Sequence, residues 1–226
     1  ADTYKYQLFW SPDGKKIMWD DKRLRLNCVD VATKEVVTIA KAEIGEIMTF
    51  VWSPDSRWIA YAKPEAVSMS KVYLYSLETK KTHAVTDGWY DSSSPCFSAD
   101  GKYLFFVSDR DFNPIFSQTE YNHVYGAMSR IYFVTLAGDT KSPFEPKSDE
   151  VEVKKEAEKT EETAKKVPAK PEASKPDEAK KEVILKIDPD GLASRLIGLP
   201  IDVANYGQIV SVGDSIYYQK RGDRDR

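Results

Sequence analysis

A short turn sequence, Ser11-Pro12-Asp13-Gly14, decides the fold because it recurs along the chain. Copies stand at residues 53–56 (Ser-Pro-Asp-Ser) and 98–101 (Ser-Ala-Asp-Gly), so that successive copies begin 42 and 45 residues apart. Proline presets φ at about −65°, aspartate accepts local backbone hydrogen bonds, and glycine readily adopts positive φ, so the sequence favours a tight turn. Apolar runs flank every copy, and each copy therefore predicts a β-hairpin.

Each turn belongs to a repeating unit of short strands. We expect the first strand to end at the turn, its hairpin partner to follow, and a third and a fourth strand to complete the unit. The expected strands are residues 7–10, 16–20, 24–29 and 36–39 in the first unit, 50–53, 58–62, 72–77 and 82–85 in the second, and 95–98 and 103–107 in the third. Four antiparallel strands every ~40–45 residues are typical of a β-propeller blade. A β-sandwich, the alternative, does not repeat a turn at a fixed period.

The third unit is irregular. A long excursion rich in Asn, Pro and Tyr occupies residues 111–129, and either Ile131–Leu136 or Val183–Ile187 supplies the third strand. Residues 208–218 then open a fourth unit. The sequence thus predicts an all-β propeller fragment of about three and a half four-stranded antiparallel blades, fewer than a typical ring requires. We therefore expect the chain to be a piece of a longer protein.

Charge is concentrated between Lys147 and Glu182. This stretch holds 10 lysines and 11 acidic residues, out of 33 basic and 36 acidic residues in the chain, and it contains no aromatic residue, Leu, Ile or Met. Such a composition buries too little apolar surface to offset ordering entropy, which predicts a long disordered insert. A short helix over residues 151–166 is the alternative. We divide the chain into blades at 1–146, the insert at 147–182, and 183–226, which completes the third blade and starts the fourth.

Composition excludes several classes of protein. The net charge of −3 argues against a nucleic-acid partner, and the absence of an apolar run of ~18 residues argues against a membrane span. Cys28 and Cys96 are too few for a disulfide framework or a four-cysteine zinc site, and both lie in strand-like runs. We expect two buried free thiols.

No known catalytic pattern is present in the sequence. There is no G-x-S-x-G nucleophile elbow, no H-E-x-x-H and no phosphate-binding G-x-x-x-x-G-K-[ST]. The two histidines, His83 and His123, lie forty residues apart, and neither stands beside a plausible nucleophile. We therefore assign no catalytic, cofactor-binding or metal-binding residue to this chain.

The start of the excursion imitates a calcium loop. Acidic and amide residues stand at its positions 1, 3, 5 and 12, but Pro114 occupies the turn position that requires glycine, and proline cannot adopt positive φ. We interpret residues 108–111 instead as a strand-end turn with a local Asp–Arg pair. The candidate functional residues, as part of a channel rim, are Asp111, Asn113, Tyr121 and His123.

Several runs give the chain a resemblance to a known family. The propeller of the tricorn proteases is resembled by residues Trp52–Tyr61, Val72–Leu77, Val85–Tyr90 and Phe97–Pro114, together with Ser142-Pro143-Phe144. The Ser-Pro-Asp-Gly turn is shared by many bacterial propellers, whereas the 108–114 run combined with residues 87–90 is much more specific. The resemblance covers nearly the whole chain except the charged insert.

The resemblance implies a role for the parent protein. In that family two propellers precede a PDZ-like domain and a serine-peptidase core, and this chain is similar to part of the second, larger propeller. It implies a non-catalytic segment that gates or channels oligopeptide substrates to a peptidase core outside the chain, in a parent that forms a homo-hexamer. The alternatives are a TolB-type protein-interaction propeller and the propeller cap of a prolyl-oligopeptidase-like enzyme. We expect a cytoplasmic protein, or a periplasmic one if a signal peptide was removed.

Overall fold

The protein is described by a computed structural model that covers residues 3–111, 114–116, 121, 123–124, 126–144 and 184–221. The chain forms two units, residues 1–141 with 183–226, and residues 142–182. Every strand belongs to the first unit. The expected insert at 147–182 lies outside the described residues.

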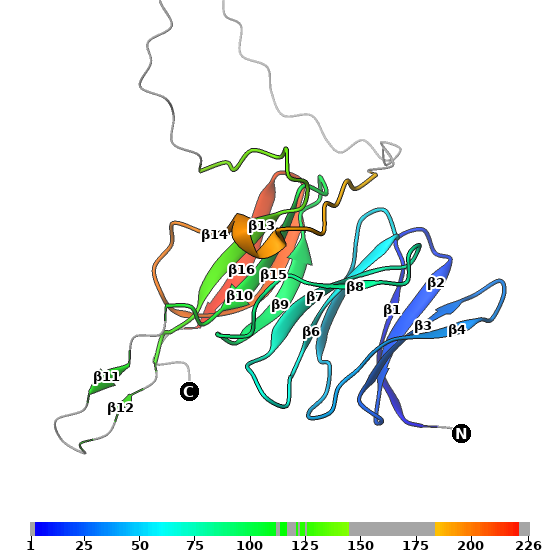
Figure 1. Cartoon of the computed structure of the whole chain (residues 1–226), viewed down its shortest axis with the longest axis horizontal. Helices are drawn as coiled ribbons and strands as arrows, with labels where there is room; N and C mark the ends of the chain where they lie inside the picture. The colour runs from blue at the N-terminus through cyan, green and yellow to red at the C-terminus, as the bar shows by residue number, and fades with distance from the viewer. Residues whose placement is uncertain are drawn as a thin grey trace, which may run out of the picture. The chain divides into compact units, whose positions relative to one another are not determined.

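Two complete four-stranded antiparallel sheets form the first part of the chain (Figure 1). Their strands follow one another in sequence order, as the repeat predicts. They are β1 (Lys5–Trp10), β2 (Lys16–Asp21), β3 (Arg25–Asp30) and β4 (Val36–Lys41) in blade 1, and β5 (Thr49–Trp52), β6 (Trp58–Lys63), β7 (Lys71–Ser76) and β8 (Thr82–Ala84) in blade 2.

The third sheet answers the question that the sequence left open. Blade 3 comprises β9 (Ser92–Phe97), β10 (Tyr103–Ser108), β13 (Arg130–Thr135) and β14 (Leu196–Gly198). The third strand is therefore the 131–136 candidate, since β13 pairs with β10 over six residues, whereas residues 184–187 form no strand. β14 follows a short 3₁₀-helix, Leu192–Arg195, and pairs with the outer side of β13.

Two shorter sheets complete the described structure. β11 (Ile115–Phe116) and β12 (His123–Val124) form a small hairpin within the excursion. β15 (Asn205–Val212) and β16 (Ser215–Arg221) form the hairpin that opens blade 4, as expected. Within the described residues, no helix has the length and hydropathy needed to cross a bilayer.

The repeated turn is built from its own side chains. Each serine hydroxyl donates to the aspartate two residues later, at 2.6 Å in Ser53–Asp55 and 2.7 Å in Ser98–Asp100. The same serine oxygen accepts the amide five residues on, which closes the hairpin. The last turn position has positive φ in all three copies, and this includes Ser56 at +60°. This local chemistry explains why the sequence predicts these turns well.

The core lies between blades. Three apolar clusters are buried, and each is shared by neighbouring sheets. One contains Met18 of blade 1 and Ile59 of blade 2, a second contains Leu74 of blade 2 and Phe106 of blade 3, and the third joins blade 3 to β15 and β16. Successive blades therefore pack face against face, which is the arrangement of a propeller.

One blade face has no neighbour among the described residues. Trp10 is 58% exposed, whereas Trp52, which occupies the equivalent position in front of the second turn, is 6% exposed because blade 1 covers it. Leu8 is exposed to the same degree as Trp10. Blade 1 thus exposes apolar residues on the face that, in blades 2 and 3, packs against the preceding blade.

The connections emerge at two opposite ends of the sheets. We call the end with residues 11–15, 53–57 and 98–102 the turn face. The loop face is the end with residues 64–70 (between β6 and β7), 85–91 (between β8 and β9) and 109–129 (between β10 and β13). The antiparallel order places these two sets at opposite ends of every blade.

Candidate functional site

Of the four predicted rim residues, Asp111 and Tyr121 have side chains that the structure describes, and these two contact different partners. Asp111 is attached to blade 3, because its carboxylate accepts a 2.8 Å hydrogen bond from the Tyr132 hydroxyl and lies 3.0 Å from Arg130 Nε. Tyr121 is exposed, and its ring lies against the ring of Phe116. Asn113 lies outside the described residues. His123 belongs to β12, and its side chain is not described.

An arginine missed by the sequence argument joins two loops of the loop face. The guanidinium of Arg110 lies 5.4 Å from the ring centre of Tyr90 and 6.0 Å from that of Tyr132, and Nη2 lies 3.4 Å from Asp87 Oδ1. We call these four residues the Arg110 clasp. The expected Asp–Arg pair within residues 108–111 is wrong, because Arg110 reaches the connection between blades 2 and 3 instead. Cation–π contacts and the ion pair hold that connection to the base of the excursion.

Burial and hydrogen bonding keep Tyr132 of the clasp protonated. Burial, followed by the hydrogen bond to Asp111, raises the pKa of Tyr132 to about 12. The phenol therefore remains protonated at neutral pH and donates to Asp111.

Hydrogen bonds join the first and last residues of the connection at 109–129. The Ser129 hydroxyl donates to Asp109 Oδ1 at 2.8 Å, across from the point where the chain leaves β10. Ser129 also forms an isolated two-way bridge with Ala204, through amide–carbonyl bonds of 3.2 and 3.0 Å. Both ends of the excursion are thereby anchored to blade 3 and to the segment that leads into blade 4.

A hollow of about 580 Å³ lies on the loop face beside the clasp. Residues 66–69 and 87–89 line it. Three of its apolar side chains are strongly exposed: Val67 at 98%, Met69 at 55% and Trp89 at 81%. The hollow is a surface depression that is widely open to solvent.

Hydrogen bonds between the two lining loops fix the walls of the hollow. The amide of Met69 donates to the carbonyl of Gly88 at 3.1 Å, and the amide of Ser70 donates to Asp91 Oδ1 at 3.1 Å. Gly88 has φ +84°, and a Cβ at this position would lie 2.2 Å from Lys71 Cε and 3.0 Å from Ser68 Oγ. Glycine is therefore required where the two loops meet.

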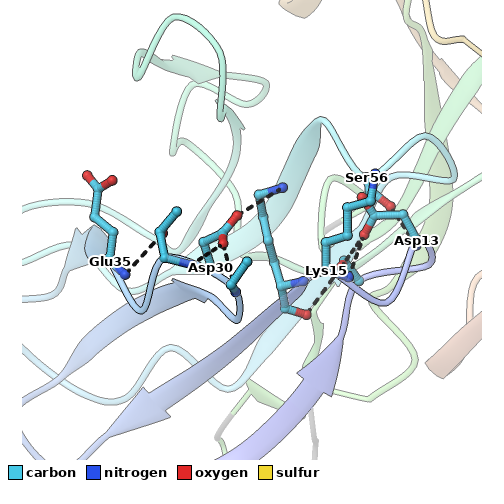
Figure 2. A network of polar contacts seen from close by, with 9 residues as sticks. Asp13, Lys15, Asp30, Glu35 and Ser56 are labelled. Atoms are coloured by element: carbon cyan, nitrogen blue, oxygen red, sulfur yellow. Dashed lines mark hydrogen bonds and ion pairs between the residues drawn. The ribbon is translucent and has the colours of Figure 1, made fainter.

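Polar groups on the turn face satisfy one another. Figure 2 shows the amide of Asp13 donating to Ser56 Oγ at 3.1 Å and the amide of Lys15 donating to Asp13 Oδ1 at 3.0 Å. The Asp30 carboxylate accepts two amides of its own turn and lies 4.0 Å from Lys16 Nζ. Main-chain hydrogen bonds hold the pKa of Asp30 below its ordinary value. This network joins blade 1 to blade 2 and leaves the loop face as the better candidate site.

The described residues provide no pairing of a hydroxyl or thiol nucleophile with a histidine. His83 lies in β8, half-buried, with its ring 6.3 Å from that of Trp58, and no hydroxyl or thiol is hydrogen-bonded to it in the described part of the chain. Cys28 and Cys96 are both free and buried, as predicted. Burial raises the pKa of Cys28 to about 11, which suppresses the reactive thiolate.

A family model and several curated relatives connect the chain to one family. A family model described as "Tricorn protease second beta propeller domain" matches residues 2–224. Tricorn protease homolog 1 of Streptomyces coelicolor is 26% identical over 208 residues, which are 92% of this chain and 18% of that protein. The tricorn protease homolog of Saccharolobus solfataricus is 33% identical over 140 residues, 62% of this chain and 13% of that protein.

A solved structure shares the fold. The crystal structure of the tricorn protease superposes with a TM-score of 0.72 at 20% identity, over 95% of this chain and 19% of that chain. The chain thus spans less than a fifth of the length of these relatives and of this solved chain.

Proposed function

Because the chain belongs to the tricorn protease second β-propeller family, we propose that it is a non-catalytic segment that gates or channels oligopeptides toward a peptidase core elsewhere in its parent. The family match over residues 2–224 is the observation that carries the proposal. The fraction of the relatives that the chain spans implies further domains in the parent.

The loop face supports the assignment of the gating element. The Arg110 clasp joins the connection at 85–91 to the base of the excursion, so the two loops keep a fixed position relative to each other. A rim that selects peptides by size needs loops in fixed positions. Cation–π and hydrogen-bonded contacts hold these loops in place. We place the gate at this clasp rather than at the four residues chosen from sequence.

The exposed face of blade 1 supports a larger assembly. A tryptophan that is covered in blade 2 is open in blade 1, and burying such a side chain contributes about 2 kcal/mol or more. Further blades of the parent are the expected cover. The PDZ-like domain, the hexameric assembly and the cytoplasmic location of the parent remain parts of this proposal, and sedimentation of the parent tests the hexamer.

A substrate-length series tests the gating function. In the full-length parent, Arg110→Ala should change kcat/KM for fluorogenic peptides of eight to twelve residues about tenfold and leave that for two- to three-residue substrates within about twofold, because only long peptides contact a rim. Arg57→Ala on the turn face is the matched control, since it removes an exposed arginine at the opposite end of a blade. The 226-residue chain alone should cleave neither set.

Two outcomes would oppose the proposal. Equal effects of the two substitutions on long and short substrates would exclude a gate at the clasp. A full-length parent inert on every peptide would favour the TolB-type interaction propeller instead.

A further inference from the structure

The hollow between residues 66–69 and 87–89 is a preformed surface that exposes apolar side chains for which the described residues provide no cover. Val67, Met69 and Trp89 project at its border, although burial of each would be favourable. Tryptophan and methionine are enriched where proteins bind partners. The hydrogen bonds from Met69 to Gly88 and from Ser70 to Asp91 fix the two walls, so the hollow exists before anything binds.

We propose that this hollow binds an apolar side chain of an extended peptide and that Asp87 receives a positively charged nitrogen of the same peptide. The inference rests on the proposed function, which brings peptides to this face. It adds a specific binding site and a preference for an apolar residue next to a cationic group.

Asp87 is the acidic group in the lining of the hollow, and Lys71 and Arg110 are basic groups beside it. Asp87 supplies the carboxylate in the lining, and its Oδ1 accepts the amide of Trp89 at 3.2 Å and faces Arg110 at the long distance of 3.4 Å. Its Oδ2 forms no hydrogen bond or ion pair within the described residues and is available to a donor. Glu65, the neighbouring acid, is already paired with Lys63 at 3.0 Å. A cationic nitrogen beside an apolar group therefore complements Asp87.

The main chain of the hollow favours a peptide over a lipid. The amides of Ala66 and Val67 take part in no hydrogen bond within the described residues, so they are available to the carbonyl groups of an extended chain. A lipid tail would leave these two amides without a hydrogen-bond acceptor, whereas the Ser68 hydroxyl already donates to the Met69 carbonyl at 3.3 Å. The mixed lining thus matches a peptide, which carries apolar side chains and polar main-chain groups together.

Binding of labelled hexapeptides to the 226-residue chain tests the proposal by fluorescence anisotropy. One peptide has a free amino terminus followed by phenylalanine and leucine, a second is its acetylated form, a third is acetylated with a lysine beside the leucine, and a fourth replaces the apolar residues with serine. We expect the first peptide to bind about tenfold tighter than the fourth. If the second peptide binds more weakly and the third does not restore affinity, the amino terminus is the cationic group. If the third peptide restores affinity, a lysine serves as well.

Matched variants locate the site. Trp89→Ser should weaken the first peptide about tenfold, whereas Trp10→Ser, which removes an exposed tryptophan of blade 1, should leave its Kd unchanged. Asp87→Asn should weaken binding of the cationic peptides about threefold and leave binding of the neutral acetylated peptide unchanged. Its control is Asp139→Asn, which removes the acid of an exposed ion pair with Lys186. Met69→Ser provides a second apolar variant, and circular dichroism checks that each variant is folded.

Several results would overturn the inference. Equal affinity for the apolar and serine peptides, or equal Kd values for the Trp89 and Trp10 variants, would exclude the hollow as a peptide site. Binding of neutral phosphatidylcholine vesicles without binding of any peptide would assign it to a membrane surface. Peptide binding at Trp89 combined with an inert full-length parent would retain this site and reject the peptidase-gating function, so the two failures are distinguishable.

Discussion

The hydroxyl of Ser56 offers a sharp test of how neighbouring blades are joined. Ser56 has φ +60°, a conformation that costs a non-glycine residue about 1–2 kcal/mol, and it stands where the other two turns have glycine. Its Oγ accepts the amide of Asp13 from blade 1 at 3.1 Å, and such a bond contributes about 1 kcal/mol. We infer that serine is retained because the inter-blade bond offsets the backbone strain.

Two substitutions separate these opposing contributions. Ser56→Ala keeps the strain and loses the bond, and it should lower the free energy of unfolding by about 1–2 kcal/mol. Ser56→Gly loses the bond but relieves the strain, and it should change stability by less than about 0.5 kcal/mol. For a domain of this size, 1 kcal/mol corresponds to a shift in Tm of roughly 2–4 °C. Urea unfolding followed by tryptophan fluorescence measures the difference.

Hydrogen exchange and a strain control complete the test. The Asp13 amide should exchange faster in both Ser56 variants, since both lose its acceptor. Gly14→Ala introduces a Cβ that would meet nothing within 4 Å at φ +68°, so it measures strain alone and should cost about 1–2 kcal/mol. Equal destabilisation by the alanine and glycine variants of Ser56 would refute the offset, and an unaltered stability of Ser56→Ala would refute the contribution of the bond.

Three further predictions follow from the loop face and the core. Gly88→Ala should lower Tm by about 2–8 °C in thermal unfolding, because the backbone has φ +84° and the new Cβ would displace the flexible end of Lys71. An unchanged Tm would contradict the strain at this position. Tyr132→Phe should reduce the loss of stability between about pH 10 and 12 in urea titrations. A phenol whose pKa is raised on folding stabilises the protein below its unfolded pKa, and this contribution is lost as the pH rises through its folded pKa. An identical alkaline loss of stability in the variant would contradict this. Cys28 and Cys96 should react with iodoacetamide at pH 8 at least about a hundredfold more slowly in the native chain than in urea, since burial raises the pKa of both thiols, and rapid native labelling measured by mass spectrometry would argue against it.

Local chemistry explains what the sequence predicted correctly. The turns at residues 11–14, 53–56 and 98–101 carry their own hydrogen-bond donors and acceptors, so the hairpins around them could be placed within a few residues. The third strand of blade 3 could not be chosen, because residues 131–136 and 183–187 are both apolar runs and the choice depends on pairing with a distant strand. The structure shows β13 paired with β10, and β14 completes the sheet.

The candidate site was less predictable because it depends on contacts between loops. Arg110 and Asp87 stand 23 residues apart, and nothing in the local sequence around Arg110 distinguishes this partner from the adjacent aspartates. The hollow requires a connection within blade 2 to meet the connection between blades 2 and 3, which only the sheet topology provides. One signal was available: Val67 and Met69 are apolar residues in a loop between strands, where polar residues are the norm.

The placement of the core between neighbouring blades has a consequence for how the molecule opens. Since each apolar cluster is shared by adjacent sheets, the stability of a blade depends mainly on the neighbour at either side. Such a linear array behaves as a row of coupled units, in which pulling on one end detaches sheets one after another rather than all at once. Blades 2 and 3, each held on both faces, should separate after blade 1 under mechanical load, and extension curves should show stepwise lengths of about one blade each.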